Sequence, residues 1–111
     1  MNWNLEYDVV VVGSGASGFS AAITAKNEGL STLLIEKQPH FGGASALSGG
    51  GVWIPNNRYL MAAGVGDSFE EAKAYLDATV GDAVPDEIKE TYLKRGVEML
   101  DYFHELNPHM R

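Results

Sequence analysis

The sequence contains no cysteine and few basic residues, and each shortage argues against a class of protein. Without cysteine there is no disulfide, no thiolate metal site and no thiol nucleophile. The 111 residues carry 8 lysines and arginines against 15 aspartates and glutamates, so the formal net charge is −7 and a nucleic-acid footprint is disfavoured. Apolar runs such as Val9–Val12 are far too short for a transmembrane segment. We therefore expect one globular domain.

The two halves of the chain differ in composition. Residues 1–66 hold 11 of the 13 glycines, whereas residues 67–111 hold 11 acidic and five basic residues. The glycine-rich half is expected to bring a ligand close to its backbone, and the acidic half to form solvated helix faces. The first residues, MNWNLEYD, lack the basic and apolar regions of a signal peptide, which predicts a cytoplasmic protein.

The first 36 residues show the pattern of a parallel βαβ unit. Residues 7–12 and 31–36 are short runs rich in valine, leucine and isoleucine, as in strands that are buried on both faces. Between them, residues 16–28 favour a helix that ends at Gly29. Because parallel strands need a crossover connection, we predict a strand, a helix and a second strand.

The rest of the chain is predicted to be a loop followed by helices. Residues 37–57 contain two glycine clusters and two prolines without sustained periodicity, which predicts an ordered loop around a ligand. We expect a short helix over residues 57–63, a second from the Ser68 capping box to Gly81, and a longer one from Pro85 to Pro108. The apolar face of the last helix is expected to contain Ile88, Tyr92, Met99, Phe103 and Leu106.

A GxGxxG motif, formed by Gly13, Gly15 and Gly18, lies where the first strand meets the first helix. In this motif the first glycine permits the turn, the second lets a pyrophosphate approach, and the third lets the helix pack closely. The helix start near Ala16 would present free amides to the phosphates. Glu36 ends the second strand, where a carboxylate accepts hydrogen bonds from a ribose and repels a 2′-phosphate. The motif predicts a dinucleotide site other than NADP; the alternative is an ordinary glycine turn with Glu36 in solvent.

A second glycine-rich region covers residues 42–51. In NAD-binding units the chain usually continues from the acidic residue into another crossover helix, but here it enters this region instead. Its glycines and small hydroxyl residues expose backbone amides that suit the oxygens of a larger ligand. Main chain without side chains can also lie against a flat ring system. The alternative for this region is a flexible glycine loop.

Several segments together resemble a known family. DVVVVGSGASG, IEK, FGGASALSGGG and VWIPNN are similar to the N-terminal flavin segment of FAD-dependent dehydrogenases in the fumarate reductase and 3-ketosteroid dehydrogenase superfamily. The run SGGGVWIPNN is most similar to the ketosteroid branch. The resemblance is strong over residues 6 to about 60 and general in the later helices.

The resemblance implies FAD as the cofactor and a set of cofactor contacts. The first motif would hold the pyrophosphate, and Glu36 and Lys37 would contact the adenosine portion. The second region would line the pyrophosphate, the ribityl chain and the isoalloxazine. The complete expected set is Gly13, Ser14, Gly15, Ala16, Ser17, Gly18, Glu36, Lys37, Gly42, Gly43, Ala44, Ser45, Ser48, Gly49, Gly50, Gly51 and Val52. The spacing of His40, His104 and His109 does not suggest a metal site.

The implied function is oxidation of a C–C bond beside a ketone, with hydride passing to the flavin. Tyrosines act as acid and base in the ketosteroid branch, but none of those motifs matches a residue here, so the catalytic residues stay unknown. The alternatives are a fumarate-reductase-like flavoprotein and a non-catalytic subunit that binds FAD or NAD. The expected ligands are FAD and a small-molecule ketone.

The expected fold class is α/β, a Rossmann-like βαβ FAD-binding segment followed by two or three helices. Residues 1–66 are assigned to that segment and residues 67–111 to a helical extension of the same domain. A lone pair of parallel strands makes a poor core. We therefore expect the fold to be incomplete without the remainder of a flavoprotein, as a second chain or a C-terminal portion.

Overall fold

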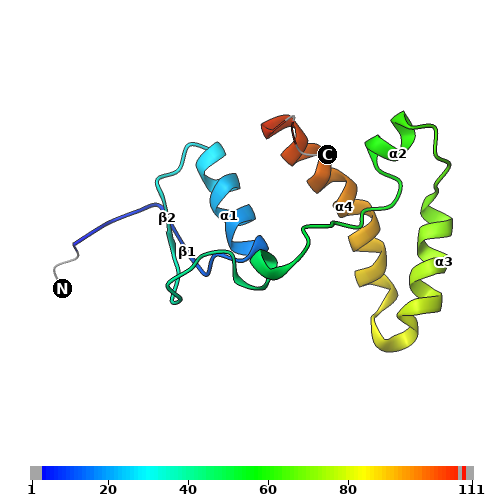
Figure 1. Cartoon of the computed structure of the whole chain (residues 1–111), viewed down its shortest axis with the longest axis horizontal. Helices are drawn as coiled ribbons and strands as arrows, with labels where there is room; N and C mark the ends of the chain where they lie inside the picture. Colours follow the sequence, from blue (N-terminus) through cyan, green and yellow to red (C-terminus); the bar gives the residue numbers. More distant parts are fainter. Residues whose placement is uncertain (1–3, 108, 110–111) are drawn as a thin grey trace. The chain divides into compact units, whose positions relative to one another are not determined.

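The computed structural model describes residues 4–107 and 109. The chain divides into two compact units, Met1–Gly51 and Val52–Arg111, here named the glycine-rich unit and the helical unit. Figure 1 shows the path of the chain through both. Among the helices that the structure describes, none has the length and apolar character needed to cross a bilayer.

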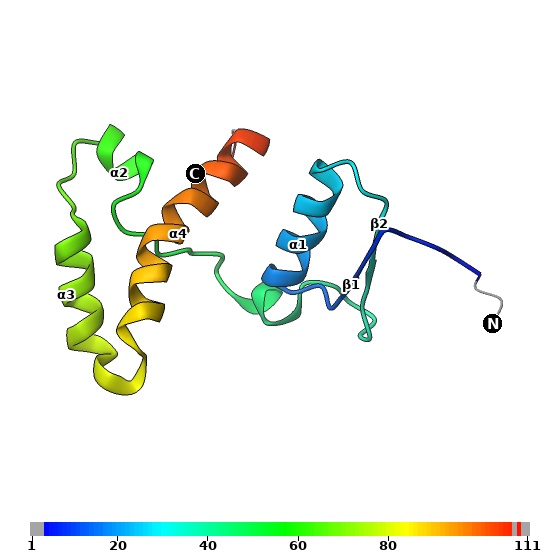
Figure 2. The same ribbon diagram turned by 180° about the vertical axis from the view of Figure 1, so that it is seen from behind.

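The glycine-rich unit confirms the predicted βαβ pattern. Strand β1 (Val9–Val12) and strand β2 (Thr32–Ile35) pair in parallel, with Val9 opposite Thr32 and Val12 opposite Ile35. Helix α1 (Ala16–Asn27) connects them and packs against both strands, as Figures 1 and 2 show from opposite sides. The valine run favours a strand because β-branched side chains suit the extended backbone.

One face of this strand pair is left uncovered by the described residues of the glycine-rich unit. Side chains alternate along a strand, so Val9 and Val11 lie on the half-buried face while Val10 and Val12 are 52% and 80% exposed. The prediction that both strands are buried on both faces is therefore wrong for this chain by itself.

The loop after β2 contains more regular structure than the sequence predicts. A 3-10 helix runs over Gly43–Leu47, inside a segment that was expected to be a loop without periodicity. It is five residues long, which is too short to leave a repeating apolar pattern. Gly42 precedes it in the left-handed region, with φ of 107°, which is accessible to glycine at little cost.

Among the described residues the helical unit contains three α-helices, and the first two of them begin after a polar cap. Helix α2 (Arg58–Ala62) begins after Asn57, whose side chain accepts hydrogen bonds from two backbone amides of the first turn. Helix α3 (Phe69–Thr79) begins after Ser68, whose hydroxyl accepts from the amide of Glu71 at 3.1 Å, as the capping box predicts. A 3-10 turn (Gly81–Ala83) then leads into α4 (Asp86–Leu106), which packs against α3 (Figure 1).

The apolar face predicted for α4 is wrong by about one residue. The buried residues of the helix are Lys89, Leu93, Gly96 and Leu100. Ile88 and Tyr92, which the pattern placed inside, are 57% and 41% exposed. The buried stripe contains a lysine and a glycine, which a count of large apolar side chains leaves out. The predicted buried face is therefore shifted by one position, which is about 100° around a helix. Gly96 allows close packing, since a Cβ there would lie 3.0 Å from Cδ1 of Ile54.

Candidate functional site

The turn between β1 and α1 has the geometry that the GxGxxG motif predicts. Gly13 has φ of 95°, and its amide donates to the carbonyl of Ile35 at 2.8 Å, which fixes the turn to the end of β2. A Cβ at Gly18 would lie 1.9 Å from the carbonyl oxygen of Gly13, so only glycine fits there. A Cβ at Gly15 would meet no atom within 4 Å. Open space beside Gly15 is what an approaching pyrophosphate needs.

The first turn of α1 is suited to an anion. Gly15 precedes the helix without capping it by a side chain, and no acidic residue lies in the first turn. The first amides of a helix lack partners within it and carry the positive end of its dipole. Ala16 and Ser17, the first residues of α1, are exposed. These features fit the phosphates of a dinucleotide.

Ser14 and Glu36 form a hydrogen-bonded pair that ties the turn to the end of β2. One carboxylate oxygen of Glu36, Oε2, accepts from the amide of Ser14 at 2.9 Å and from its hydroxyl at 2.6 Å. The other oxygen, Oε1, accepts from the amide of Gln38 at 2.9 Å. These bonds, above all the one from the Ser14 hydroxyl, lower the pKa of Glu36 to about 2. Glu36 is therefore ionised at neutral pH, as a ribose-binding carboxylate requires.

The exposure of Ser14 sets it apart from the other predicted contacts. Ser14 has a relative exposure of 0%. A side chain without exposed surface offers a ligand nothing to touch, so the structure does not support the expectation that Ser14 contacts the cofactor.

The second glycine-rich region begins beside the first motif. The amide of Gly42 donates to the hydroxyl of Ser14 at 2.9 Å, and a Cβ at Gly43 would lie 3.4 Å from the Cα of Gly15. The two glycine-rich segments are therefore in contact, as one continuous ligand site requires. The remaining predicted residues of this unit are exposed and include Lys37, Ala44, Ser45, Ser48, Gly49, Gly50 and Gly51. Val52 opens the helical unit, so its place in the site stays a prediction.

Glu36 predicts a pH dependence of stability. Its pKa is near 4.5 when free of partners and falls to about 2 in the fold, so its stabilising contribution is complete above pH 4.5 and is lost as the pH falls toward 2. We expect thermal unfolding followed between pH 5 and pH 2 to show a smaller loss of melting temperature in Glu36→Gln than in the unchanged protein. Equal losses in the two proteins would contradict this assignment.

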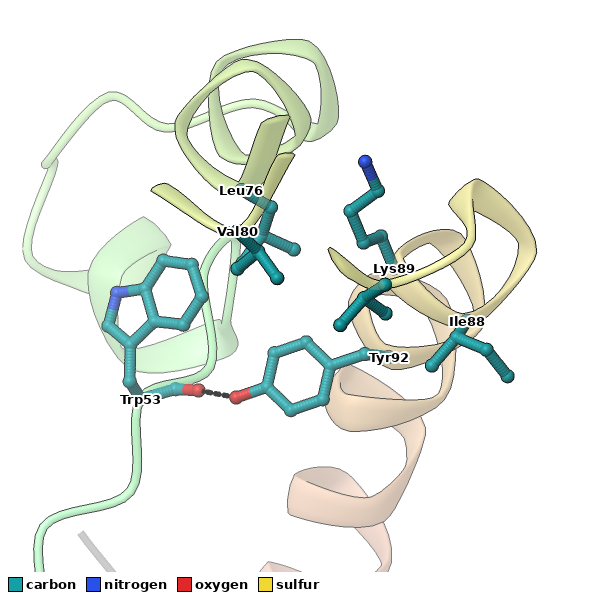
Figure 3. A pocket seen from close by; sticks show the side chains of 7 residues that line it. Trp53, Leu76, Val80, Ile88, Lys89 and Tyr92 are labelled. Carbon is teal, nitrogen blue, oxygen red and sulfur yellow. Dashed lines mark hydrogen bonds between the residues drawn. The ribbon is translucent and has the colours of Figure 1, made fainter. Parts of the chain in front are cut away.

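A cavity of about 270 Å³ lies in the helical unit (Figure 3). It is lined by Trp53, Leu76, Val80, Val84, Ile88, Lys89 and Tyr92. The Trp53 and Tyr92 rings stack with centroids 6.1 Å apart, and the Tyr92 hydroxyl donates to the Trp53 carbonyl. This contact supports a packing role for Trp53.

The charged group that lines this cavity, the Lys89 ammonium, is already engaged with two carboxylates. The ammonium of Lys89 contacts Asp77 at 2.5 Å and Asp86 at 2.7 Å, and these bonds raise its pKa. The cavity is also smaller than the range of about 300–1,000 Å³ that is usual for small-molecule sites. We therefore assign it no ligand.

Within the described part of the chain, no group of three or more histidine, aspartate or glutamate side chains is placed to hold a metal ion. His104 is half-buried and its Nδ1 lies 2.8 Å from the Tyr59 hydroxyl.

Sequence reasoning missed two contacts that shape the glycine-rich unit. Phe41 packs edge-on against Phe19 of α1, with ring centroids 6.1 Å apart, and so ties the loop before the second glycine region to the helix. Asp8 and Ser31, at the starts of the two strands, are joined by three hydrogen bonds. The signal for this pair was an acid and a hydroxyl just before strands that pair in parallel.

Comparison with known proteins identifies the family. Residues 8–111 match the family model described as FAD binding domain. The chain is 58% identical over 103 residues to 3-oxosteroid 1-dehydrogenase from Mycolicibacterium smegmatis, which covers 93% of this chain and 18% of that protein.

Two crystal structures are also similar. One is 3-ketosteroid delta1-dehydrogenase from Sterolibacterium denitrificans in complex with 1,4-androstadiene-3,17-dione, with a TM-score of 0.77, 44% identity and coverage of 89% of this chain and 17% of that one. The other is 3-ketosteroid-delta4-(5alpha)-dehydrogenase from Rhodococcus jostii in complex with 4-androstene-3,17-dione, with a TM-score of 0.81, 31% identity and coverage of 96% and 22%.

The chain belongs to the FAD-binding domain family, and FAD is its cofactor. The expected α/β class and the resemblance to 3-ketosteroid dehydrogenases are thereby confirmed. The chain spans 18% of the length of the M. smegmatis relative.

Proposed function

We propose that this chain is the FAD-binding portion of a 3-ketosteroid dehydrogenase that introduces a C=C bond next to the ketone. The observation that carries this proposal is the high identity to a 3-oxosteroid 1-dehydrogenase over nearly the whole chain, including both glycine-rich regions. The identity to the delta4-(5alpha) enzyme is lower, so the 1,2 position is the favoured site of dehydrogenation.

The proposed cofactor contacts follow from the geometry of the glycine-rich unit. Gly13, Gly15 and the amides at the start of α1 hold the pyrophosphate, and the ionised Glu36 accepts from the ribose. The predicted contacts of the second region, and those of Lys37 and Val52, complete the site and stay proposals.

Bound FAD supplies the acceptor for the hydride that leaves the carbon adjacent to the deprotonated one. The part of this chain is to bind the cofactor and orient it, because none of its tyrosines is assigned as acid or base. Tyr92 is engaged with the Trp53 carbonyl and Tyr59 with His104, which leaves neither hydroxyl poised for proton transfer to a ketone. We propose that the acid and base come from the remainder of the flavoprotein.

The uncovered face of β1 and β2 supports the existence of that remainder. Parallel strands occur almost only in sheets that are covered on both faces. Here Val12 is 80% exposed and Ile35 43% exposed. We propose that further strands and a covering layer of the same flavoprotein complete this sheet.

A spectroscopic experiment tests the proposed function. The purified flavoprotein that contains this chain is expected to show flavin absorbance, and a saturated 3-ketosteroid added without oxygen should bleach it and yield the 1,2-unsaturated ketone by mass spectrometry. Bleaching with a 4,5-unsaturated product would favour the delta4 reaction. Reoxidation of reduced flavin by fumarate would favour a fumarate-reductase-like enzyme. A flavin that no ketosteroid reduces would overturn the proposal.

A further inference from the structure

Ser14 is the most protected residue of the glycine-rich unit. Among residues 4–51 it is the only one in the buried class, and it has no exposed surface at all. Burial of a polar side chain is costly unless its hydrogen-bonding groups have partners. The most buried residue of this unit is therefore a polar one, and its burial has to be balanced by hydrogen bonds.

The polar groups of Ser14 are engaged within the chain. Its amide and its hydroxyl both donate to Oε2 of Glu36, and its hydroxyl oxygen accepts from the amide of Gly42. A serine hydroxyl offers one donor, which is used here, and two acceptor positions, of which one is used. Neither the amide nor the hydroxyl hydrogen is left for a phosphate oxygen.

The hydroxyl joins three segments that are far apart in sequence. Ser14 belongs to the turn after β1, Glu36 ends β2, and Gly42 opens the second glycine-rich region. Glu36 is itself proposed to accept from the ribose, and Gly42 opens the region whose residues are predicted to contact the cofactor. Fixing them relative to the turn before the cofactor arrives reduces the ordering cost of binding.

We infer that Ser14 is a positioning residue for FAD: its hydroxyl, placed between the Glu36 carboxylate and the Gly42 amide, sets the spacing of the two glycine-rich regions without touching the cofactor. This inference rests on the proposed function of the same site. Alanine at position 14 leaves the Gly42 amide unpaired and Glu36 one bond short. Cysteine keeps a similar size and offers only a weak donor.

The test compares Ser14→Ala with Ser20→Ala, a half-buried serine of α1 outside the site. FAD affinity is measured by flavin fluorescence on the complete flavoprotein after its flavin has been removed. Loss of a hydrogen bond to a charged group predicts about tenfold weaker binding in Ser14→Ala, with Ser20→Ala within about twofold of the unchanged protein. Ser14→Cys is expected to lie between them and provides the comparison if Ser14→Ala does not fold.

A double-mutant cycle separates positioning from a general loss of stability. Because the hydroxyl also accepts from the Gly42 amide, adding Ser14→Ala to Glu36→Ala should still weaken FAD binding, but by clearly less than about tenfold, since the part that acts through Glu36 is already lost. The same tenfold loss in both backgrounds would overturn the inference. So would FAD affinities of Ser14→Ala and Ser14→Cys that equal the unchanged protein. If the variants bind FAD as well as the unchanged protein does, the proposed function stands and only the role of Ser14 is lost. If the unchanged protein itself does not bind FAD, the proposed function is lost.

Discussion

Gly18→Ala is expected to weaken FAD binding by at least about 100-fold, because the turn that holds the pyrophosphate cannot close around an added methyl group. The new Cβ would lie 1.9 Å from the carbonyl oxygen of Gly13 and 2.9 Å from its carbonyl carbon. Both atoms belong to the backbone, so no flexible side chain can move aside. Relief requires moving the start of α1 away from the end of β1. The melting temperature is expected to fall together with FAD affinity, as measured by thermal unfolding and flavin fluorescence.

Two other glycines distinguish this effect from a general sensitivity to alanine. A Cβ at Gly15 meets no atom within 4 Å, so Gly15→Ala should keep the melting temperature of the protein without flavin and lose FAD affinity. Gly66 is exposed in the helical unit with equally open surroundings, and Gly66→Ala should change neither quantity. Normal FAD binding by Gly18→Ala would show that the turn is not built as described.

Leu93→Ala is expected to destabilise the protein by about 2–5 kcal/mol, the usual cost of truncating a buried leucine. Leu93 lies on the buried face of α4 and is 5% exposed. Its side chain is one of few large apolar groups that are buried in the helical unit, so the cavity left behind has little to fill it. The measurement is the midpoint of chemical unfolding, followed by circular dichroism.

Ile88→Ala is the matched control for this helix. Ile88 belongs to the face that the apolar pattern predicts, yet it is 57% exposed, so its truncation should cost less than about 1 kcal/mol. A larger effect for Ile88→Ala than for Leu93→Ala would restore the face predicted from the sequence and contradict the one in the structure.

The parts of the fold that could be predicted were those with strong local signals. The valine run, the glycine motif and the helix after it gave the βαβ unit, because strand preference and turn geometry are both set by neighbouring residues. Ser68 and its capping box marked the start of α3 for the same reason. These features depend on contacts within a few residues.

The parts that could not be predicted depend on distant contacts. Lys89 lies on the buried face of α4 because Asp77 and Asp86 neutralise its charge, and Gly96 lies there because Ile54 packs against it. Ser14 matched a variable position of the motif, and only its approach to Glu36 and Gly42 reveals a different role. The spacing of apolar residues along the sequence does not reveal partners that lie far apart in the chain.

Two serine–carboxylate pairs, Asp8–Ser31 and Ser14–Glu36, fix the register of β1 relative to β2. Four valines opposite Thr32–Ile35 offer almost the same apolar contacts if one strand slips along the other, so packing alone discriminates poorly between alignments. Slippage by a single position would separate Asp8 from Ser31 and Ser14 from Glu36 together, and would break five hydrogen bonds between these pairs. The hydrogen bonds at the two ends thus select one alignment for two strands whose central residues are almost all apolar and similar in shape.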